Sequence, residues 1–283
     1  MITFDIQNLI DAAFAEDVLT GDPTTDVLIP PELLGSAALV TRDHGVLAGI
    51  DVATASFERF DPSLRTKALM TDGSGVCPGD RLAQVRGRVA SILKAERTAV
   101  NFLQHLSGIA SETRRYVDAV SGLGAKIVDT RKTTPGLRKL EKYAVTMGGG
   151  YNHRQNLADG ILIKDNHVEA LALQGLGIGE VVKRAQAGAS HTIKVEIEVD
   201  TIAQLKEVLD AGADLVLLDN MPPEQMKEAV KITDGRAVLE ASGGITLETV
   251  RAIAETGVDI ISVGALTHSA PAMNVGLDMV IDR

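Results

Sequence analysis

The residues best suited to chemistry lie in one cationic stretch, at positions 129–167. Eight Lys or Arg residues face three Asp or Glu residues between positions 126 and 164, although the whole chain has a formal net charge of −10. Three consecutive glycines at 148–150 interrupt the stretch. Buried cations are stable only where an anion meets them. The pattern therefore predicts a site for a small, highly anionic substrate.

The composition excludes several other classes of function. Aromatic residues make up 3% of the 283 residues, and there is no Trp, so a stacking platform for nucleic acid is not expected. The acidic balance also opposes binding to a phosphate backbone. A single cysteine, Cys77, rules out an intrachain disulfide framework. Neither a signal peptide nor a long apolar run is found, so we expect a cytoplasmic enzyme without a nucleic-acid or membrane partner.

The second part of the chain alternates between strand-like and helix-like segments. Helical patterns occupy residues 201–211, 222–232 and 246–256. Short apolar runs, the last four about 22 residues apart, begin near Lys126, Ile161, Ile193, Leu215, Ala237 and Ile260. Strand, helix and strand at this spacing predict parallel βαβ units.

The charge pattern of one predicted strand favours a barrel. Lys194, Glu196 and Glu198 alternate with apolar residues, so the three charges share one face. That face fits the lumen of a barrel, whereas the buried strands of an open doubly wound sheet are apolar on both faces. We therefore predict an α/β barrel.

The first hundred residues show a different organisation, which predicts a separate α/β sandwich domain. We place this domain at residues 1–108, the barrel at 109–267, and a C-terminal segment that packs back on the N-terminal domain at 268–283. A long helix from about 94 to 120 is expected at the junction. Shorter elements are expected at 5–16 and 49–60 (helices) and at 36–41 and 66–71 (strands).

Cationic candidates follow two of the predicted barrel strands, where the catalytic face of a barrel lies. Arg131 and Lys132 occupy a turn rich in Thr, Pro and Gly, and the simpler interpretation is a solvated turn. His153 and Arg154 follow the three glycines, which let the backbone approach a ligand. Together with Lys164 they favour a clamp for carboxylate or phosphate. Lys164 alone can also be a barrel lysine with a solvated head, or a Schiff-base lysine.

Carboxylates and glycines follow the next strands. Glu198 and Asp219 end consecutive strands and predict Mg²⁺ held together with substrate phosphates, although one of them can instead pair with Lys194. The residues Ser242, Gly243, Gly244 and Gly264 end the last two strands, where barrels usually bind phosphate. Arg97 lies on the long helix opposite its apolar stripe and, taken alone, is a solvated helix charge.

These motifs resemble the quinolinate phosphoribosyltransferase family, whose members are type II phosphoribosyltransferases. The similar segments, in chain order, are EDVLTGDPTTD, ERTAVNFLQHLSGIAS, DTRKTTPGLR, GGGYNHRQNLADGILIKDNH, VEIEVD, LVLLDNM, LEASGGI and ISVGALTHS. The resemblance implies an N-terminal α/β sandwich followed by an irregular, open α/β barrel. It also implies transfer of the phosphoribosyl group of phosphoribosyl pyrophosphate to quinolinate with decarboxylation, giving nicotinate mononucleotide, pyrophosphate and CO₂ for de novo NAD synthesis.

The resemblance assigns roles to the candidate residues. Arg131, His153, Arg154 and Lys164 would hold the two carboxylates of quinolinate, and Lys132 would neutralise nearby charge. Glu198 and Asp219 would meet the ribose hydroxyls and Mg²⁺, without any organic cofactor. Lys132, Lys164, Glu198 and Asp219 are thereby the expected catalytic residues, and Ser242, Gly243, Gly244 and Gly264 would bind the 5′-phosphate. Arg97 would enter the site of the partner subunit in a homodimer, which can associate further into hexamers.

Three alternatives remain at this point. A related phosphoribosyltransferase for another substrate would keep the phosphate loops and change the clamp at Arg131, His153 and Arg154. A Schiff-base aldolase would use Lys164 as its nucleophile. A non-catalytic anion sensor would bind quinolinate and release no pyrophosphate.

Overall fold

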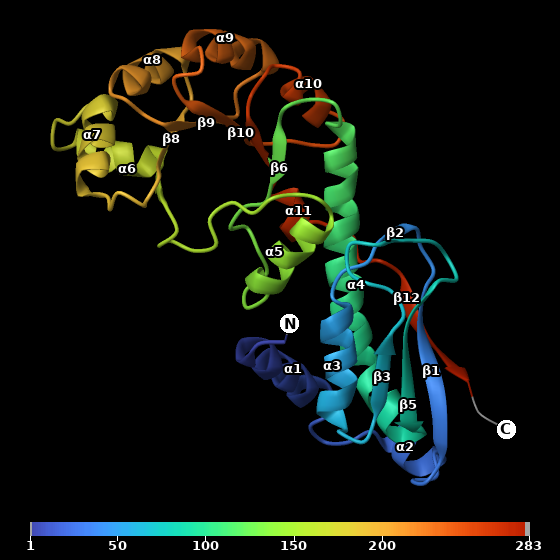
Figure 1. Cartoon of the computed structure of the whole chain (residues 1–283). Helices are drawn as coiled ribbons and strands as arrows, with labels where there is room; N and C mark the ends of the chain where they lie inside the picture. The colour runs from blue at the N-terminus through green and yellow to red at the C-terminus, as the bar shows by residue number, and fades with distance from the viewer. Residues whose placement is uncertain (1, 281–283) are drawn as a thin grey trace. The chain divides into compact units, whose positions relative to one another are not determined.

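The computed structural model describes residues 2–280 and divides them into two compact units (Figure 1). Unit 1 contains the chain up to Arg114, the insertion Thr134–Gly149 and the segment from Ala270 onward. Unit 2 contains Arg115–Thr133 and Gly150–Ser269. Within residues 2–280, no helix combines the length and apolar character needed to cross a membrane.

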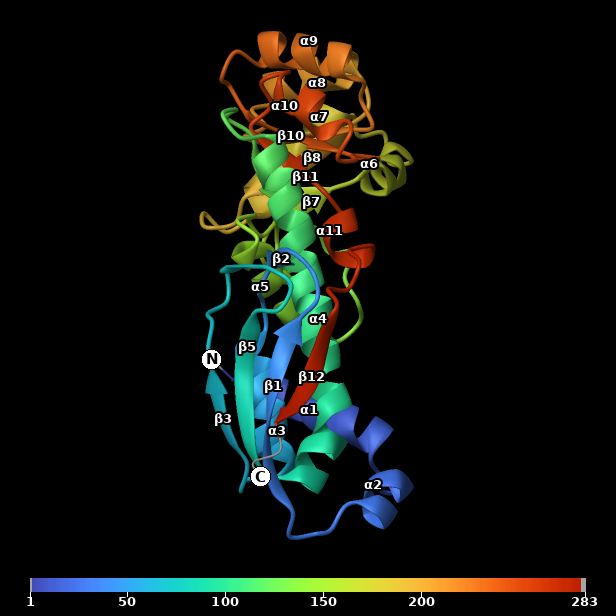
Figure 2. The same ribbon diagram turned by 90° about the vertical axis from the view of Figure 1, so that its right-hand side faces the viewer.

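Unit 1 is built on a four-stranded antiparallel sheet with the strand order β12-β1-β5-β3 (Figure 2). Its strands are β1 (Leu34–Thr41), β3 (Arg65–Ala68), β5 (Arg81–Arg88) and β12 (Val275–Val280), and a small second sheet pairs β2 (Gly45–Val46) with β4 (Gly75–Val76). Its helices are α1 (Phe4–Asp17), α2 (Pro23–Leu28), α3 (Ile50–Phe60), α5 (Arg138–Met147) and most of α4 (Val89–Ala119). The last strand, β12, thus joins the first, β1, in one sheet.

The core of unit 1 lies between the four-stranded sheet and two helices. Apolar side chains recur at helical spacing on α4, and Ala95, Ala99 and Leu103 are fully buried there. They pack with Phe57 of α3 and with Leu39 of β1. Arg97 lies on the other side of α4 and is exposed. The apolar stripe of α4 therefore anchors unit 1, as its spacing predicts.

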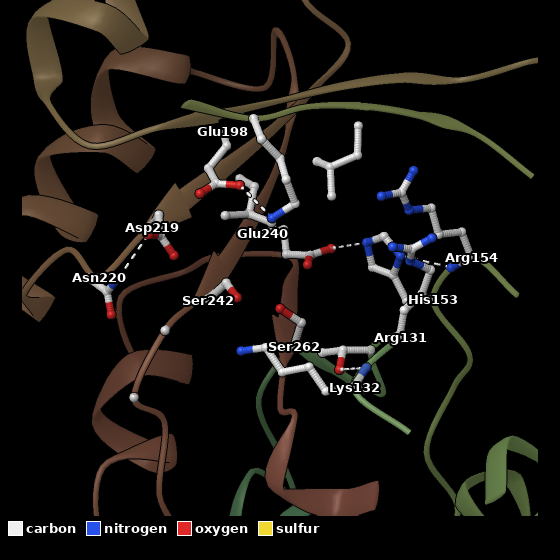
Figure 3. A pocket seen from close by; sticks show the side chains of 16 residues that line it. Arg131, Lys132, His153, Arg154, Glu198, Asp219, Asn220, Glu240, Ser242 and Ser262 are labelled. Atoms are coloured by element: carbon white, nitrogen blue, oxygen red, sulfur yellow. Dashed lines mark hydrogen bonds and ion pairs between the residues drawn. The ribbon is translucent and has the colours of Figure 1, made fainter. Parts of the chain in front are cut away.

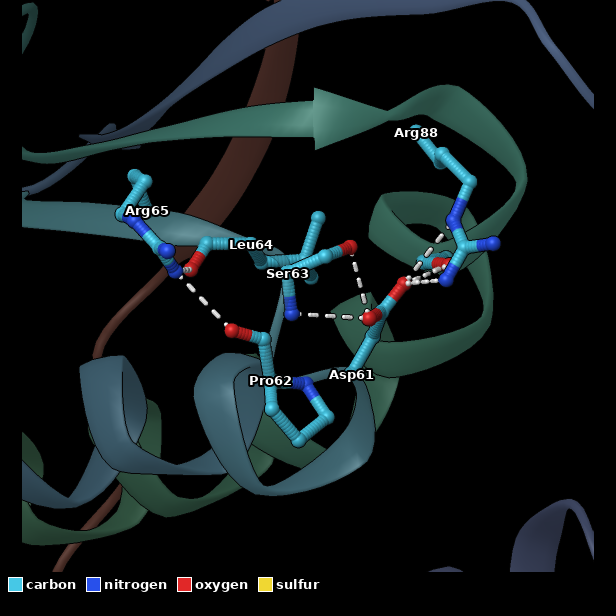
Figure 4. A network of polar contacts seen from close by, with 7 residues as sticks. Asp61, Pro62, Ser63, Leu64, Arg65 and Arg88 are labelled. Carbon is cyan, nitrogen blue, oxygen red and sulfur yellow. Dashed lines mark hydrogen bonds and ion pairs between the residues drawn. The ribbon is translucent and has the colours of Figure 1, made fainter.

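A buried carboxylate fixes the end of α3 (Figure 4). Asp61 follows α3, and its Oδ1 accepts hydrogen bonds from the backbone N–H of Ser63 at 2.9 Å and from the Ser63 hydroxyl at 2.7 Å. Its Oδ2 accepts from the Arg88 guanidinium at 2.8 Å and from the Ser91 hydroxyl at 2.6 Å. Burial acts to raise the pKa of Asp61, but the hydrogen bonds from Ser91, Ser63 and Arg88 outweigh it and lower that pKa well below its usual range.

Unit 2 is a six-stranded parallel sheet with the order β6-β11-β10-β9-β8-β7. The strands are β6 (Lys126–Val128), β7 (Ile161–Ile163), β8 (Val195–Val199), β9 (Leu215–Asp219), β10 (Val238–Ser242) and β11 (Ile260–Ser262). No pairing joins β6 to β7 in the described part of the chain, so the barrel is open, as predicted. The parallel direction places the carboxyl ends of all six strands at one edge.

The helices of unit 2 connect these strands. They are α6 (Asp165–Ala172), α7 (Ile178–Gly188), α8 (Ile202–Asp210), α9 (Pro223–Thr233), α10 (Val250–Ala254) and α11 (Ala265–His268). The hydroxyl of Thr201 caps α8 by accepting from the backbone N–H of Gln204 at 3.2 Å. Helix α10 is shorter than the predicted range 246–256, because Thr246 and Thr249 form a hydrogen-bonded turn before it.

The two units differ from the sequence-based domain limits by a few residues at the boundaries, since residues 109–114 belong to unit 1 and residues 268–269 to unit 2, and by one larger insertion. Residues 134–149 pack with unit 1, although they fall inside the predicted barrel range of 109–267. The physical reason is the buried face of α5: Leu140, Glu141 and Val145 are at most 4% exposed. Glu141 accepts hydrogen bonds from His105 Nε2 at 2.8 Å and from Thr134 N at 3.0 Å, both within unit 1.

Candidate active site

A cavity of about 540 Å³ opens at the carboxyl ends of the unit 2 strands. Figure 3 shows its lining side chains, with Arg131, His153 and Arg154 on one side and Glu198 and Asp219 on the other. It brings together ten of the twelve predicted site residues: Arg131, Lys132, His153, Arg154, Lys164, Glu198, Asp219, Ser242, Gly243 and Gly244. The other two, Gly264 and Arg97, do not line it.

Four cations line this cavity, and we call them the cation group: Arg131, Lys132, Arg154 and Lys164. The loop after β6 is held by the Thr130 hydroxyl, which accepts from Lys132 N at 3.0 Å, and by the Thr267 hydroxyl, which donates to Lys132 O at 2.8 Å. Arg154 donates to Gly160 O at 3.2 Å. Hydrogen bonds to backbone atoms thus hold the loops that carry these positive side chains in place.

The cation group carries charge that is incompletely matched by the protein. Burial lowers the pKa of the Arg154 guanidinium, and the nearby positive charge of Arg131 lowers it further. Two guanidiniums held close together repel each other unless an anion lies beside them. The geometry therefore favours an anionic ligand at Arg131 and Arg154.

Two carboxylates stand at the ends of neighbouring strands. Lys164 Nζ lies 3.2 Å from Glu198 Oε2, and Asn220 Nδ2 donates to Asp219 Oδ2 at 2.8 Å. Burial raises the pKa of Glu198, while its contact with Lys164 opposes this rise. Carboxylate oxygens are hard ligands suited to Mg²⁺, which prefers a few protein oxygens together with substrate phosphates and water. Glu198 and Asp219 therefore fit Mg²⁺ that is shared with a phosphorylated substrate.

The glycine loop after β10 is shaped by a close approach. Gly243 has φ +93°, and a Cβ on it would overlap the side chain of Asn220. Asn220 itself has a positive φ of 53°, which Asn tolerates better than most residues, and its N–H donates to Ser242 O at 2.9 Å. Glycine at 243 is thus required by both conformation and space.

A buried group lies at the floor of the cavity, and we call it the lumen cluster: His153, Glu196 and Glu240. His153 Nε2 lies 3.3 Å from Glu196 Oε2 and 3.5 Å from Glu240 Oε2. Glu196 on β8 and Glu240 on β10 are 6% and 3% exposed. The second oxygen of each has no hydrogen-bond partner among the described residues. Buried carboxylate oxygens without partners are uncommon and point to a function.

The charges of the lumen cluster are strongly perturbed. Hydrogen bonds to Glu196 and Glu240 raise the pKa of His153 to about 10, although burial opposes the rise. Burial raises the pKa of Glu196, and the negative charge of Glu240 adds to this effect. A smaller cavity of about 220 Å³ borders the cluster on the side of Lys194 and Asp159.

The two predicted residues that do not line the cavity have other surroundings. A Cβ on Gly264 would lie 3.1 Å from Lys132 Cδ, so this glycine lets the Lys132 side chain pass. Arg97 belongs to unit 1, and its guanidinium, with 59% of the side chain exposed, is 4.0 Å from Glu96. Within one chain Arg97 is therefore a surface cation.

Sequence reasoning missed Asn220 and Ser262, which also line the cavity, and it gave no role to Glu240. A signal for Glu240 was present, because a Glu inside the apolar strand Val238–Ser242 must point into a lumen. Asn220 gave a weaker signal, since an Asn after a strand is common in ordinary turns.

Comparisons with known proteins agree with this geometry. The model of the quinolinate phosphoribosyl transferase N-terminal domain matches residues 22–107, and that of the C-terminal domain matches residues 109–278. The chain is 41% identical over 278 residues to a probable nicotinate-nucleotide pyrophosphorylase [carboxylating] of Bacillus subtilis, covering 98% of this chain and 94% of that protein. It is 43% identical over 281 residues to the nicotinate-nucleotide pyrophosphorylase [carboxylating] of Mycobacterium leprae, covering 96% of each.

A solved structure supports the same assignment. The nicotinate-nucleotide pyrophosphorylase of Francisella tularensis superimposes with a TM-score of 0.93 at 39% identity, covering 99% of this chain and 98% of that chain. Two domain models that together span most of the sequence, and relatives of this identity over nearly the full length, leave no room for a different family. The chain belongs to the quinolinate phosphoribosyl transferase family.

Proposed function

We propose that this protein transfers the phosphoribosyl group of phosphoribosyl pyrophosphate to quinolinate and releases pyrophosphate and CO₂. The product is nicotinate mononucleotide, the entry into NAD biosynthesis. The observation that carries this proposal is that Arg131 and Arg154 face Glu198 and Asp219 across one cavity. A pyridine dicarboxylate beside a multiply phosphorylated sugar needs both kinds of side chain.

The cation group binds and orients the dicarboxylate. Arg131 and Arg154 face its carboxylates, and their mutual repulsion in the free protein is relieved when the dianion binds. Lys164 and Lys132 lie at the border toward the sugar and stabilise negative charge on the leaving pyrophosphate. This orientation aims the ring nitrogen at C1 of the ribose.

The opposite side of the cavity serves the sugar phosphate. Glu198 and Asp219 accept hydrogen bonds from the ribose hydroxyls and stabilise the positive charge that develops at C1 as pyrophosphate leaves. Ser242, Gly243 and Gly244 offer a hydroxyl and backbone N–H groups to the 5′-phosphate. Glu198 and Asp219 would hold Mg²⁺, which would supply charge neutralisation for the phosphates of the substrate.

Loss of CO₂ follows from the new bond. Once the ring nitrogen is bonded to C1 it is positively charged, and the C2–carboxylate bond breaks with its electron pair left on C2. The adjacent positive nitrogen stabilises that pair, and a proton then adds to C2. The step uses no protein nucleophile. The Schiff-base alternative is disfavoured because Lys164 Nζ is engaged in an ion pair with Glu198 Oε2 at 3.2 Å.

The assembly and location follow from the resemblance alone and stay predictions. We propose a homodimer in which Arg97 of each subunit enters the site of the other, with further association into hexamers, working in the cytoplasm. Exposure of Arg97 supports this role, because an arginine on the surface of one chain is free to reach another.

A direct assay tests the function. Purified protein is incubated with quinolinate, phosphoribosyl pyrophosphate and Mg²⁺, and CO₂, pyrophosphate and nicotinate mononucleotide are measured. The three products should appear in equal amounts. Nicotinate lacks the carboxylate at C2 and leaves a half-buried cation without its anion, which costs about 1.5–3 kcal/mol, so its turnover should be about 10- to 100-fold slower. Ligand binding without pyrophosphate release would instead indicate an anion sensor.

A further inference from the structure

The imidazole of His153 is contacted at both of its nitrogens by the protein. Nε2 faces the carboxylates of Glu196 and Glu240, at 3.3 and 3.5 Å. Nδ1 accepts a hydrogen bond from the backbone N–H of Arg154 at 2.8 Å. The backbone is fixed in turn, because His153 N donates to Asp129 Oδ1 at 2.9 Å. The ring therefore links two strands of the barrel, β8 and β10, to the backbone of Arg154.

These contacts define which nitrogen carries the ring proton. Nδ1 accepts from Arg154, so it must keep its lone pair, and the proton lies on Nε2 toward the carboxylates. A proton on Nδ1 would face the Arg154 N–H at hydrogen-bond distance and would be repelled. The raised pKa of His153 by itself favours a second proton on the ring, whereas the Arg154 N–H at 2.8 Å from Nδ1 opposes a proton on that nitrogen. The hydrogen-bond geometry decides between the two, because Nδ1 cannot carry a proton and accept from Arg154 at the same time.

The same contacts weigh against a metal ion in the lumen cluster. One nitrogen and two carboxylates within 4.8 Å of one another are a plausible ligand set by type. Coordination through Nε2 requires the proton of the neutral ring to sit on Nδ1. That is the nitrogen that accepts from Arg154. The hydrogen-bond pattern therefore favours direct contact of the ring with the two carboxylates, without a metal ion between them.

We infer that Glu196 and Glu240 are positioning residues for the dicarboxylate site. They hold the His153 ring with its proton on Nε2, and the ring holds the Arg154 backbone beside Arg131. The substrate carboxylates then receive their hydrogen bonds from Arg131 and Arg154, and His153 acts as a connector between the glutamates and Arg154. This inference rests on the proposed function for the identity of the substrate.

The charge of Glu196 explains why the arrangement persists in the free protein. Arg131 and Arg154 repel each other, and the negative charge of Glu196 acts in the opposite direction on Arg154. Glu196 thus compensates part of the positive charge of the clamp. The clamp is thereby formed before the dianion arrives, which reduces the reorganisation needed on binding.

The tautomer of His153 provides a direct test. The protein contains six histidines, so ¹⁵N labelling of histidine with a His153→Gln reference variant identifies the signals of this ring. Near neutral pH we expect a protonated Nε2 and an unprotonated Nδ1, unchanged when quinolinate is added. A ring protonated at both nitrogens, or one that gains a proton on Nδ1 with quinolinate, would overturn the inference. So would added Zn²⁺ that shifts Nε2 to a metal-bound value.

Substitutions of Glu240 give an independent test on function. Glu240→Ala removes an acceptor of the Nε2 proton. Residues that orient a binding group from behind typically change affinity or activity by about 10- to 100-fold, so the KM for quinolinate should rise by that factor. Glu240→Gln keeps a carbonyl acceptor and should stay within about threefold of the wild type, since the ring orientation is retained. The KM for phosphoribosyl pyrophosphate should be unchanged in both. The same pair of changes applies to Glu196.

The matched control is Glu224→Gln, which removes an exposed glutamate from α9 of the same unit and should change neither KM. A parallel rise of both KM values with a lower Tm, and no rescue by Gln, would show a merely structural role and overturn the inference. Failure of the proposed function looks different. In that case the wild type forms no nicotinate mononucleotide, whereas the ¹⁵N spectra still report the tautomer.

Discussion

Two buried acidic sites in this molecule are built in opposite ways. In unit 1 both oxygens of Asp61 accept hydrogen bonds from Ser63, Arg88 and Ser91, and the pKa of this carboxyl is lowered. In unit 2 Glu196 and Glu240 both contact Nε2 of His153, and each has one oxygen without a partner among the described residues. Burial raises the pKa of Glu196.

The difference separates stability from function. A carboxylate whose lone pairs are all used contributes to folding, because removing it leaves donors unpaired. A buried carboxylate that has an oxygen without a hydrogen-bond partner, close to several cations, does not maximise the stability of the fold. Its presence therefore requires a functional reason. We expect changes at the Asp61 network to alter the free energy of unfolding, and changes at the cavity to alter catalysis.

The largest effect is expected for Arg131→Gln. The loss of a half-buried guanidinium that meets a substrate carboxylate through two charge-assisted hydrogen bonds should lower kcat/KM for quinolinate by about 10³-fold, because each such bond contributes about 1.5–3 kcal/mol. The Tm should be unchanged or slightly higher, because the repulsion with Arg154 is removed. Activity assays and thermal unfolding measure the two quantities. A large fall in Tm would show that Arg131 stabilises the fold, which would contradict our assignment of the cavity residues to catalysis alone.

A second experiment tests whether the cavity is completed by another subunit. Arg97→Ala and Lys164→Ala should each reduce activity by about 10²-fold, as expected for misplaced substrate, with little change in folding. In a mixed dimer one site carries both changes and the other carries none, so mixing the two variants should restore up to about half of the activity per dimer. Subunit exchange without recovery would mean that Arg97 does not act across a dimer.

Asp61→Asn tests whether the Asp61 network of unit 1 contributes to stability and not to activity. The amide presents N–H groups where Arg88 and Ser91 donate, so we expect a loss of about 2 kcal/mol in the free energy of unfolding, with activity per folded molecule unchanged. The pKa of Asp61 in the folded protein is lower than in the unfolded chain, where it is about 3.9. The wild-type carboxylate therefore stabilises the protein above about pH 3.9, and this contribution is lost as the pH falls further toward the folded pKa. Urea unfolding at several pH values measures this, and the variant should show a weaker acid dependence.

The smallest effect concerns the sugar side of the cavity. Asp219→Asn should raise the KM for phosphoribosyl pyrophosphate by about tenfold, the equivalent of one charge-assisted hydrogen bond, and weaken the response to Mg²⁺. Binding of quinolinate alone, measured by calorimetry, should change little. A variant that loses quinolinate affinity and keeps its Mg²⁺ response would show that Asp219 belongs with the clamp.

Most of the fold could be predicted from the sequence, because apolar and polar residues alternate with a clear helical or strand period. The alternation around Glu196 indicated a lumen, and the stripe through Ala99 and Leu103 indicated a buried helix. The insertion at 134–149 was not predicted, since its place in unit 1 depends on contacts such as Glu141 with His105, which are 36 residues apart. Local patterns carry no information about such pairs.

The site was predictable to a similar degree. Charged residues at strand ends, such as Arg131, Lys164 and Asp219, could be located because parallel strands align those ends. The grouping of His153 with Glu196 and Glu240 was not, because it depends on how far each side chain reaches into the lumen. The tautomer of His153 likewise follows from a backbone contact that no sequence pattern encodes.

The pairing of β12 with β1 has a consequence for how the protein is made. The sheet of unit 1 receives its edge strand at residues 275–280, after every residue of unit 2 has been synthesised. A chain emerging from the ribosome can therefore complete the parallel sheet of unit 2 while β1 still lacks this neighbour. Until then the open edge of β1, with Ala37 and Leu39 in its middle, is exposed to pairing with other chains. Nascent chains are thus at risk of aggregation from the synthesis of β1 until residue 280 has been added, while all of unit 2 is being made.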